Sequence, residues 1–599
     1  MATAVSAALA HRRHLIVQAG TGTGKSLAYL VPLLVSGARI VVATATKALQ
    51  DQLATRDLPM LAQHLDHPFQ FAVLKGRSNY LCRQRAVEVG SGEQLALDDA
   101  GSGHGPFARE IQRLLVWGKD SPTGERGDLS FEPTPRAWAQ VSVGHTECPG
   151  ATRCPSGDAC FAEAARRRAG DADVVVVNTH LYAFHLLSGG GLLPPHDIAV
   201  FDEAHELEDI ASASLGFDLT PHRLRALARN ARPLVDDPGP IGALDAAGDL
   251  VETALAARAG SRLQPPLEAD LADALSLTRE RVAAVVAASR AAETDDPRRA
   301  RTLEAGTHLL DDLDGILMLR DGNVAWVDKG PQSSVLEVAP LDVGSSLEAL
   351  WWSQPDAPIA VLTSATIPPG IGGRLGLAPG SFDELDVGSP FDYASAALLY
   401  CARHLPDPRA PGFESASHDE LVSLIQAAGG RTLALFTSWR AMRAAAGAVA
   451  PRVPFRILTQ ADLPKAALIE AFRHDEQSCL FATMGFWQGV DVPGRTLSLV
   501  VVDRIPFPRP DDPLLQARRD RLGRDAFRLI DIPRAATLLA QGAGRLIRSG
   551  HDRGVVAVLD RRLSTARYGW DLVKAMPPMR RTRHRTEVEA FLGAMSPAG

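Results

Sequence analysis

Residues 19–26, AGTGTGKS, combine the residue types that hold phosphate oxygens. Glycines at alternate positions let backbone N–H groups turn inward around a phosphate, and Lys25 can reach the β- and γ-phosphates of a nucleotide. The Ser26 hydroxyl is a ligand for Mg²⁺. A chance glycine-rich turn is the alternative, but the flanking sequence and a second motif favour a phosphate-binding loop. Its residues are Ala19, Gly20, Thr21, Gly22, Thr23, Gly24, Lys25 and Ser26.

The second motif, VFDEAH at residues 200–205, supplies carboxylates and an imidazole. The run IAVF has the composition of a strand, which places Asp202 at a strand's C-terminal end, where open α/β sheets bind ligands. There Asp202 can hold Mg²⁺, Glu203 can orient and deprotonate an attacking water, and His205 lies near the γ-phosphate. Four letters alone are a weak signal. Together with Lys25 upstream they predict hydrolysis of a nucleoside triphosphate.

Two arginines in QGAGRLIRSG, residues 541–550, can supply positive charge to the same reaction. Arg545 and Arg548 are three residues apart, so they share a helix face. Surface charge is the usual role of such a pair. Hydrolysis nevertheless needs a cation near the γ-phosphate, and an arginine from another domain is a common source. If these arginines and Gln541 face the phosphate loop, hydrolysis is coupled to closure between two domains.

Four of the six cysteines have a spacing that suggests thiolate ligands. The last three fall in CPGATRCPSGDAC, among prolines and glycines that predict a loop. Disulfides are disfavoured in a reducing cytoplasm, and the spacing alone leaves zinc, an iron–sulfur cluster or unrelated structural cysteines open. Cys401 and Cys479 are isolated, and we expect them to be buried apolar residues. The four candidate ligands are Cys82, Cys148, Cys154 and Cys160.

The elements that position these residues belong to a large globular protein. The chain has 599 residues, 46% apolar and 22% charged, which suits several domains with ample core. Leu15–Val17 before the phosphate loop predicts a strand, and spaced leucines after it predict a helix. Apolar runs predict further strands at 431–436, 478–483, 497–505 and 554–560. No apolar run approaches the ~18 residues of a membrane helix and no signal peptide is visible, so we expect a cytoplasmic protein without a membrane partner.

The net charge of −7 does not indicate a polyanionic partner, but the charge is unevenly distributed. Residues 376–599 hold 29 basic and 24 acidic side chains, a balance of +5, which leaves −12 for residues 1–375. The densest basic run is RRTRHR at 580–585. It is at least as typical of a solvated tail as of a phosphate contact.

The motifs, in their number, order and spacing, resemble those of superfamily 2 DNA helicases of the DinG/XPD group, and most of all bacterial DinG-like enzymes. The resemblance runs almost end to end and no single motif carries it. It rests on AGTGTGKS, VATATKALQDQL (42–53), LKGRSNYLC (74–82), DEAH, APLDVGSSL (339–347), LTSATI (362–367), VGSPFDY (387–393), LALFTSWRAM (433–442), GFWQGVDVPG (485–494) and QGAGRLIR (541–548).

The resemblance implies an α/β fold with two RecA-like P-loop motor domains, each a parallel sheet with flanking helices. It also implies an inserted iron–sulfur domain and a mostly helical arch domain. The expected bounds are 1–75, 170–215 and 335–375 for motor domain 1, 76–169 for the iron–sulfur domain, 216–334 for the arch and 376–599 for motor domain 2.

The resemblance further implies ATP, Mg²⁺ and a 4Fe–4S cluster held by the four cysteines. Gly489 and Asp491 would lie near the nucleotide. The implied partner is single-stranded DNA, in forked, D-loop or R-loop structures, with 5′-to-3′ movement by a monomer. Phosphate contacts that do not read sequence would dominate strand binding, which salt should weaken. The candidate strand contacts are Thr44, Thr46, Thr437, Ser438 and Trp439.

Two other functions stay open from the sequence. One is a remodeller of RNA or DNA–RNA hybrids with the same engine, because the 2′-OH contacts that would distinguish the strands cannot be placed. The other is a non-motor scaffold with a decayed nucleotide site, against which the complete set of catalytic residues argues. The resemblance implies an initial segment that contacts the adenine, and this sequence does not contain it. Either the segment is missing or the start was placed too late. Because MATAVSAAL resembles the latter part of the family's first helix, we expect the natural start to lie upstream of Met1.

Overall fold

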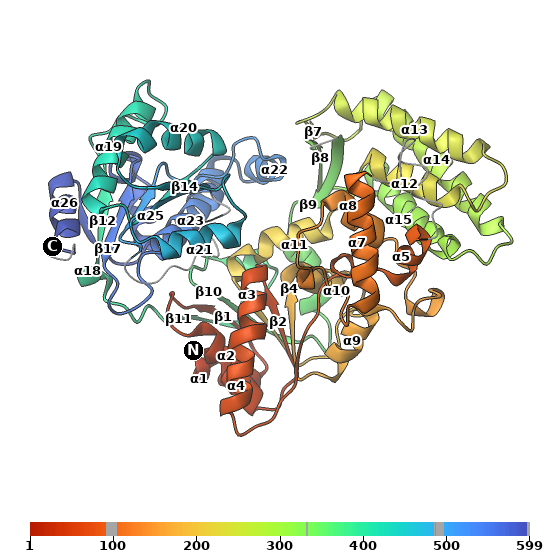
Figure 1. The fold of residues 1–599 in the computed structure, drawn as a ribbon, viewed down its shortest axis with the longest axis horizontal. Coiled ribbons are helices and arrows are strands. Elements are labelled where there is room, and N and C mark those ends of the chain that lie inside the picture. The colour runs from red at the N-terminus through yellow and green to blue at the C-terminus, as the bar shows by residue number, and fades with distance from the viewer. Residues whose placement is uncertain (91–104, 331–332, 484–485, 487–495, 596–599) are drawn as a thin grey trace.

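The computed structural model describes residues 1–90, 105–330, 333–483, 486 and 496–595. Within these residues two seven-stranded parallel sheets form the centres of two α/β units, which lie side by side, with a helical part on the far side of the first unit (Figure 1). The predicted fold class, two α/β domains with parallel sheets and flanking helices, is confirmed.

The first sheet is apolar on both faces, as a parallel sheet covered by helices must be. Its strand order is β11 (Phe382–Asp386), β1 (His14–Gln18), β10 (Ile359–Ser364), β5 (Ile198–Asp202), β2 (Ile40–Thr44), β4 (Val174–Asn178) and β3 (Phe71–Val73). Along β4, Val174 and Val176 face one layer of helices, and Val175 and Val177 face the other. The first layer is α1 (Ala2–His11), α2 (Lys25–Val35) and α4 (Leu58–His64); the second includes α10 (Thr179–Leu187), α11 (Leu207–Leu215), α16 (Val343–Leu347) and α17 (Ile371–Arg374).

The second sheet contains all four strands that apolar runs predicted in this half of the chain. Its order is β14 (Ile457–Thr459), β15 (Cys479–Thr483), β13 (Thr432–Phe436), β16 (Leu499–Val502), β17 (Gly554–Val558), β12 (Ala397–Cys401) and β18 (Arg580–Thr582). Cys401 and Cys479 are buried in it, as expected. Its helices are α18 (Tyr393–Ala396), α19 (Phe413–Ala428), α20 (Trp439–Val449), α21 (Lys465–His474), α22 (Pro513–Leu522), α23 (Ile532–Ala543), α24 (Arg562–Thr565), α25 (Gly569–Ala575) and α26 (Arg585–Gly593).

One expected boundary is wrong. The first α/β unit does not end at residue 375, because β11 pairs in parallel with β1 in the first sheet. The sequence of β11, FDELD, hides this role, since an edge strand with one side open to water tolerates charges that a central strand does not. The crossing to the second unit therefore follows Asp386.

A first insertion leaves the sheet after β3 and returns at β4. It consists of α5 (Arg83–Gly90), α7 (Pro106–Asp120), α8 (Pro135–Val141) and α9 (Phe161–Asp171), and it carries the four candidate cysteine ligands. Ile111 and Leu114 of α7 belong to the same buried cluster as the residues of the first sheet. The insertion is therefore packed continuously onto the first α/β unit.

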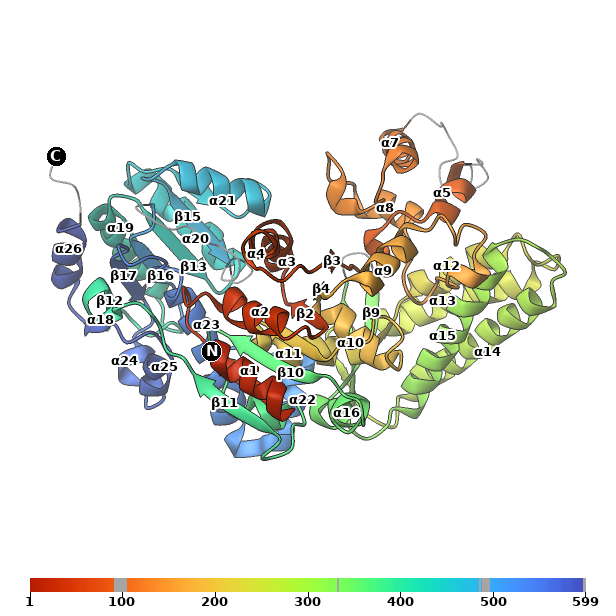
Figure 2. The same cartoon turned by 90° about the horizontal axis from the view of Figure 1, so that it is seen from below.

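A second insertion consists of α12 (Pro221–Ala231), α13 (Gly239–Ala256), α14 (Ala269–Ala291) and α15 (Arg298–Met318). It is mostly helical, as expected, but it also holds a small antiparallel sheet in the order β6 (Phe217–Leu219), β9 (Ser334–Pro340), β8 (Asn323–Lys329), β7 (Arg262–Leu263). β9 lies in this sheet, although residues 335–375 were expected to return wholly to motor domain 1. Figure 2 shows the insertion extending away from the second α/β unit.

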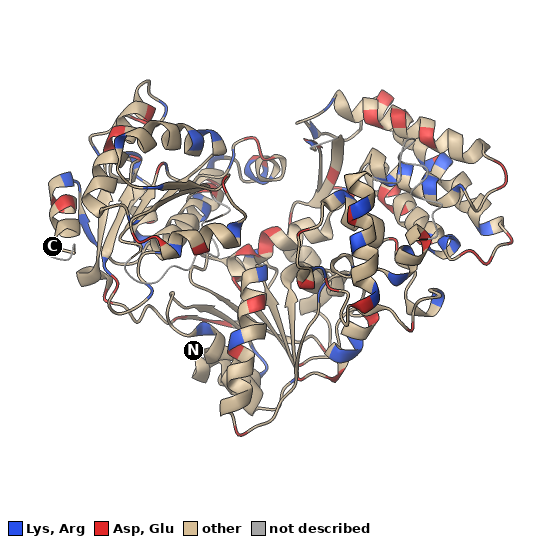
Figure 3. Ribbon diagram, in the orientation of Figure 1, with Lys and Arg blue, Asp and Glu red and all other residues tan. Residues whose placement is uncertain are grey.

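Acidic and basic residues are interleaved along α7 and over the helices of the second insertion (Figure 3). No helix in the described part of the chain is both long and apolar enough to cross a membrane.

Candidate active site

The predicted phosphate loop connects β1 to α2, which begins at Lys25. Gly22 and Gly24 have φ angles of +79° and +70°, in the left-handed region that glycine alone adopts without strain. A Cβ atom on Gly22 would come within 2.3 Å of the Phe391 ring. The loop thus has both the backbone shape and the close approach that require glycine.

Asp202 ends β5, as predicted, and its buried carboxylate accepts hydrogen bonds from the Tyr29 hydroxyl at 3.2 Å and the Glu203 N–H at 3.0 Å. Glu203 has a φ of +62°, which is unusual for a residue other than glycine and is found at functional sites. Its Oε1 lies 3.7 Å from Lys25 Nζ. The structure therefore brings Lys25, Asp202 and Glu203 together, whereas no sequence motif pointed to Tyr29.

The other carboxylate oxygen of Glu203 is bound to a polar chain. Glu203 Oε2 accepts from Ser364 Oγ at 3.0 Å, and that hydroxyl lies 2.9 Å from His205 Nδ1. Burial raises the pKa of Asp202. Burial also acts to raise the pKa of Glu203, but the charge of Lys25 and the contacts with His205 and Ser364 outweigh it and hold that pKa below its ordinary value.

The second α/β unit reaches this site through α23. The Nε2 atoms of Gln541 and His205 are 2.6 Å apart. A Cβ atom on Gly544, just after the helix, would lie 3.6 Å from Thr21 of the phosphate loop. Arg545 and Arg548 follow at once, and their Nε atoms are buried. Both side chains are half-buried just beyond the end of α23.

The segment that joins the two units also lies against the phosphate loop. The Gly20 N–H donates to Gly388 O at 3.0 Å, and Thr21 Oγ1 is 3.5 Å from the Tyr393 hydroxyl. Gln18 donates to Asp386 at 3.0 Å and accepts from the Ile367 N–H at 2.9 Å. The contacts of VGSPFDY with the loop were not predicted, because they join segments far apart in the chain.

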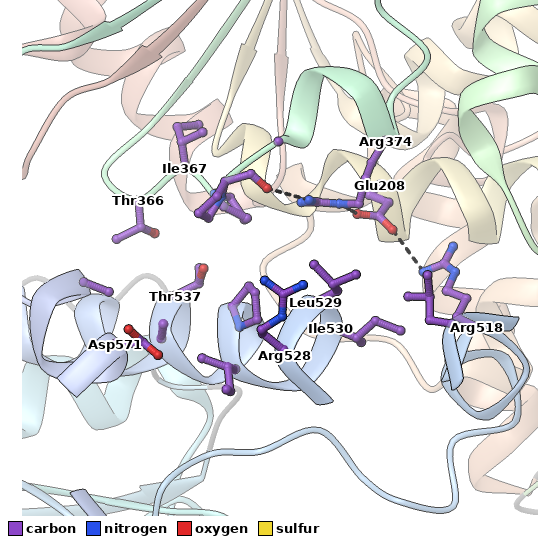
Figure 4. A pocket seen from close by; sticks show the side chains of 18 of the residues that line it. Glu208, Thr366, Ile367, Arg374, Arg518, Arg528, Leu529, Ile530, Thr537 and Asp571 are labelled. Atoms are coloured by element: carbon purple, nitrogen blue, oxygen red, sulfur yellow. Dashed lines mark hydrogen bonds and ion pairs between the residues drawn. The ribbon is translucent and has the colours of Figure 1, made fainter. Parts of the chain in front are cut away.

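A cavity of about 1040 Å³ opens between the two units beside this site (Figure 4). Thr366 and Ile367 line it from the first unit, and Thr537 and Asp571 line it from the second. Glu208 forms part of its wall, between Arg374 and Arg518 (Figure 4).

The predicted strand contacts are only partly at the surface. Thr44 is fully buried and its hydroxyl donates to Thr46 O at 3.2 Å, so the expectation that it contacts a strand is corrected. Thr46 caps the N-terminus of α3 (Lys47–Gln52), and Ser438 caps that of α20. Trp439 is 41% exposed at the start of α20. Gly489 and Asp491 lie outside the described residues.

The four candidate cysteine ligands are grouped in the first insertion, half-buried and without disulfides. Burial is the main cause that raises the pKa of Cys82 to about 11, and the charges of Cys148 and Cys154 add to it. Burial also raises the pKa of Cys154, and the charges of Cys148 and Cys160 raise it further. No three His, Cys, Asp or Glu side chains in the described segments are arranged to hold one metal ion. Four thiols without disulfides in one insertion are the donor set that an iron–sulfur cluster takes.

Comparison with known proteins places the chain among helicases. A family described as DEAD/DEAH box helicase matches residues 2–85, and a family described as Helicase C-terminal domain matches residues 421–579. The "ATP-dependent helicase DinG" of Mycobacterium tuberculosis is 42% identical over 100% of this chain and 95% of its own length. The "ATP-dependent DNA helicase YoaA" of Escherichia coli is 34% identical over 100% and 96%. The solved structure "XPD_Helicase", 16% identical with a TM-score of 0.59 over 97% of this chain and 98% of its own, has the same fold.

Proposed function

We propose a polarity and a substrate for this chain, which belongs to the DinG/YoaA family of ATP-dependent DNA helicases. It moves 5′ to 3′ along single-stranded DNA. It opens forked, D-loop or R-loop structures in replication and repair. The chain is an ATP-hydrolysing DNA helicase, and its two α/β units are the motor. One observation carries the coupling of hydrolysis to movement: Gln541 of α23 contacts His205 of the DEAH segment, and Gly544 at the end of α23 lies close to the phosphate loop.

Residues of the first unit bind the triphosphate and activate water. Backbone N–H groups of the loop and Lys25 hold the phosphates, and Ser26 and Asp202 would hold Mg²⁺, which offsets phosphate charge. In this structure Lys25 lies beside Glu203. When phosphates draw Lys25 away, Glu203 loses its main cationic partner, and its pKa rises. Glu203 then becomes a stronger base for the attacking water.

Residues of the second unit stabilise the charge that spreads over the γ-phosphate. Arg545 and Arg548 follow Gly544, which lies close to Thr21 of the loop, and they would turn toward the phosphate. Gln541 links their helix to His205. We propose that Gly489 and Asp491 complete this side of the site.

A strand would be held along the N-termini of α3 and α20. Backbone N–H groups and hydroxyls at Thr46, Thr437 and Ser438 suit phosphates, and the exposed ring of Trp439 suits base stacking. Such contacts do not read sequence. Binding should therefore weaken steeply with salt.

We further propose that Cys82, Cys148, Cys154 and Cys160 hold a 4Fe–4S cluster, in a unit spanning 76–169, and that the second insertion, from β6 to β9, is the arch. The cluster would cross-link four thiolates and so stiffen the insertion that separates the strands. Cysteines that are reduced agree with a protein of the cytoplasm, which we propose as its location. We also propose that the protein acts as a monomer.

The test uses the full chain, purified without oxygen, on duplexes with a 5′ or a 3′ single-stranded tail. We expect ATP-dependent unwinding of the 5′-tailed duplex only, and stronger stimulation of ATP hydrolysis by single-stranded DNA than by RNA. Glu203→Gln is the matched control, since it keeps size and hydrogen bonding but removes the base. Unwinding from the 3′ tail would refute the polarity, and preference for RNA would refute the substrate.

A further inference from the structure

Two acidic residues directly after the DEAH segment bind arginines of the second unit. The Asp209 carboxylate receives two hydrogen bonds from Arg534 of α23, at 2.5 and 2.6 Å. Glu208 lies 3.3 Å from Arg518 of α22 and also accepts from Arg374 of its own unit at 2.9 Å, as Figure 4 shows. Arg518 is 8% exposed. None of these residues belongs to a motif that predicted chemistry.

The Asp209–Arg534 pair and the His205–Gln541 contact join the same two segments. His205 and Asp209 are four residues apart, and Arg534 and Gln541 are seven apart, which is two helical turns of α23. Contacts at two separate points fix both the rotation and the sliding of a helix against its partner. Arg545 and Arg548 follow the end of α23, so its register sets where they lie.

Polar contacts matter here because a cavity separates the two units over part of their interface. The 1040 Å³ cavity opens between the units beside Glu208 and Arg518. Burial acts to raise the pKa of Asp209, but the hydrogen bonds and charge of Arg534 outweigh it and hold that pKa below its ordinary value. A bidentate, charge-assisted pair of this kind has a defined geometry as well as energy.

We propose that Asp209 and Arg534 are positioning residues, which hold α23 in register with the DEAH segment so that Gln541, Arg545 and Arg548 meet the nucleotide. The inference rests on the proposed function. The Asp209–Arg534 pair should therefore affect the rate of the chemical step and not the affinity for ATP, because Arg545 and Arg548 act only as charge spreads over the γ-phosphate in the transition state.

The test is a double-mutant cycle on DNA-stimulated ATP hydrolysis. We expect Asp209→Asn and Arg534→Gln each to lower kcat about tenfold, with the KM for ATP changed less than about twofold. If the two residues act as a unit, the double variant loses no more than the worse single variant. Arg534→Lys, which keeps the charge but not the fork, should recover part of the loss.

Arg509→Gln is the matched control, because it breaks an exposed ion pair with Asp511 inside the second unit. Thermal midpoints and DNA binding without nucleotide should stay at the wild-type level in all variants. Losses that multiply in the double variant, or a KM that rises while kcat holds, would overturn the inference. An inactive wild-type protein would instead refute the proposed function.

Discussion

The Nε2 atoms of Gln541 and His205 lie 2.6 Å apart, and this contact joins the second α/β unit to the DEAH segment of the first. His205 is also 2.9 Å from Ser364 Oγ, which donates to Glu203. An uninterrupted chain of polar contacts therefore runs from α23 to the proposed base. This chain, which passes through Ser364 at the end of β10, links the position of α23 to that of Glu203.

Gln541→Ala should uncouple the two units. We expect the rate of DNA-stimulated ATP hydrolysis to fall about tenfold, because a typical coupling free energy between two sites, about 1.4 kcal/mol, corresponds to that factor. ATP binding should be retained. The measurement is ATP turnover with and without single-stranded DNA. Gln516→Ala, which removes a contact with Pro510 O within the second unit, is the control. Equal stimulation in both variants would contradict the role of the contact.

Lys25→Ala should abolish ATP hydrolysis and spare strand binding, since Lys25 is the loop's cation and belongs to neither α3 nor α20. Turnover is measured by phosphate release, and strand binding by fluorescence anisotropy of labelled DNA. Retained turnover would remove the loop from the mechanism.

Gly22→Ala should lose nucleotide binding. The new methyl group would meet the Phe391 ring at 2.3 Å, in addition to the cost of about 1–2 kcal/mol for a φ of +79°. Gly37→Ala is a matched control, because its φ is +73° and no atom lies within 4 Å of the new methyl group. The thermal midpoint with and without ATP separates the two costs. Equal behaviour of both variants would show that Phe391 yields freely.

Cys154→Ser should give a colourless protein that loses iron and unwinding but keeps some ATP hydrolysis, because the motor residues lie outside the insertion. Iron content and the visible spectrum of anaerobic protein are the measurements. Cys401→Ser, in the second sheet, is the control and should stay brown. A colourless wild-type protein that unwinds fully would rule out the cluster's role.

Asp503→Asn should make the second unit less sensitive to pH. Burial raises the pKa of Asp503 from 3.8 to about 7, so ionisation costs stability as pH rises between those values, by about 4 kcal/mol in total. The asparagine can still accept from the Thr437 N–H, as Asp503 does at 3.1 Å. We expect the variant to gain stability over the wild type at pH 8 and less at pH 5, measured by urea unfolding. The exposed Asp511→Asn should show no such difference.

Local patterns predicted the elements, and distance along the chain limited the rest. The apolar run at 431–436 correctly predicted a central strand, because a strand buried on both faces requires such a run. The edge strand β11 was missed, since its charges face water. Thr44 was wrongly predicted to contact the DNA strand. A motif does not show that the Thr44 hydroxyl donates to the backbone of its own loop, at Thr46 O.

The site was predicted to the level of its motifs but not its contacts. Lys25 and Glu203 come from segments that motifs identified. The pairing of Asp209 with Arg534 joins residues 325 positions apart, and neither stands in a recognisable pattern. Ion pairs between the two α/β units can be identified only once the relative position of the two sheets is known.

The second insertion begins and ends on neighbouring strands, for Phe217 of β6 pairs antiparallel with Val338 of β9. Adjacent strands are only about 5 Å apart, so a tight turn from Leu219 to Leu336 could close the gap if the helices between were excised. The second insertion therefore leaves and rejoins the first unit at almost the same point. A chain shortened in this way would keep both α/β units, so its ATP hydrolysis could be measured apart from the separation of strands.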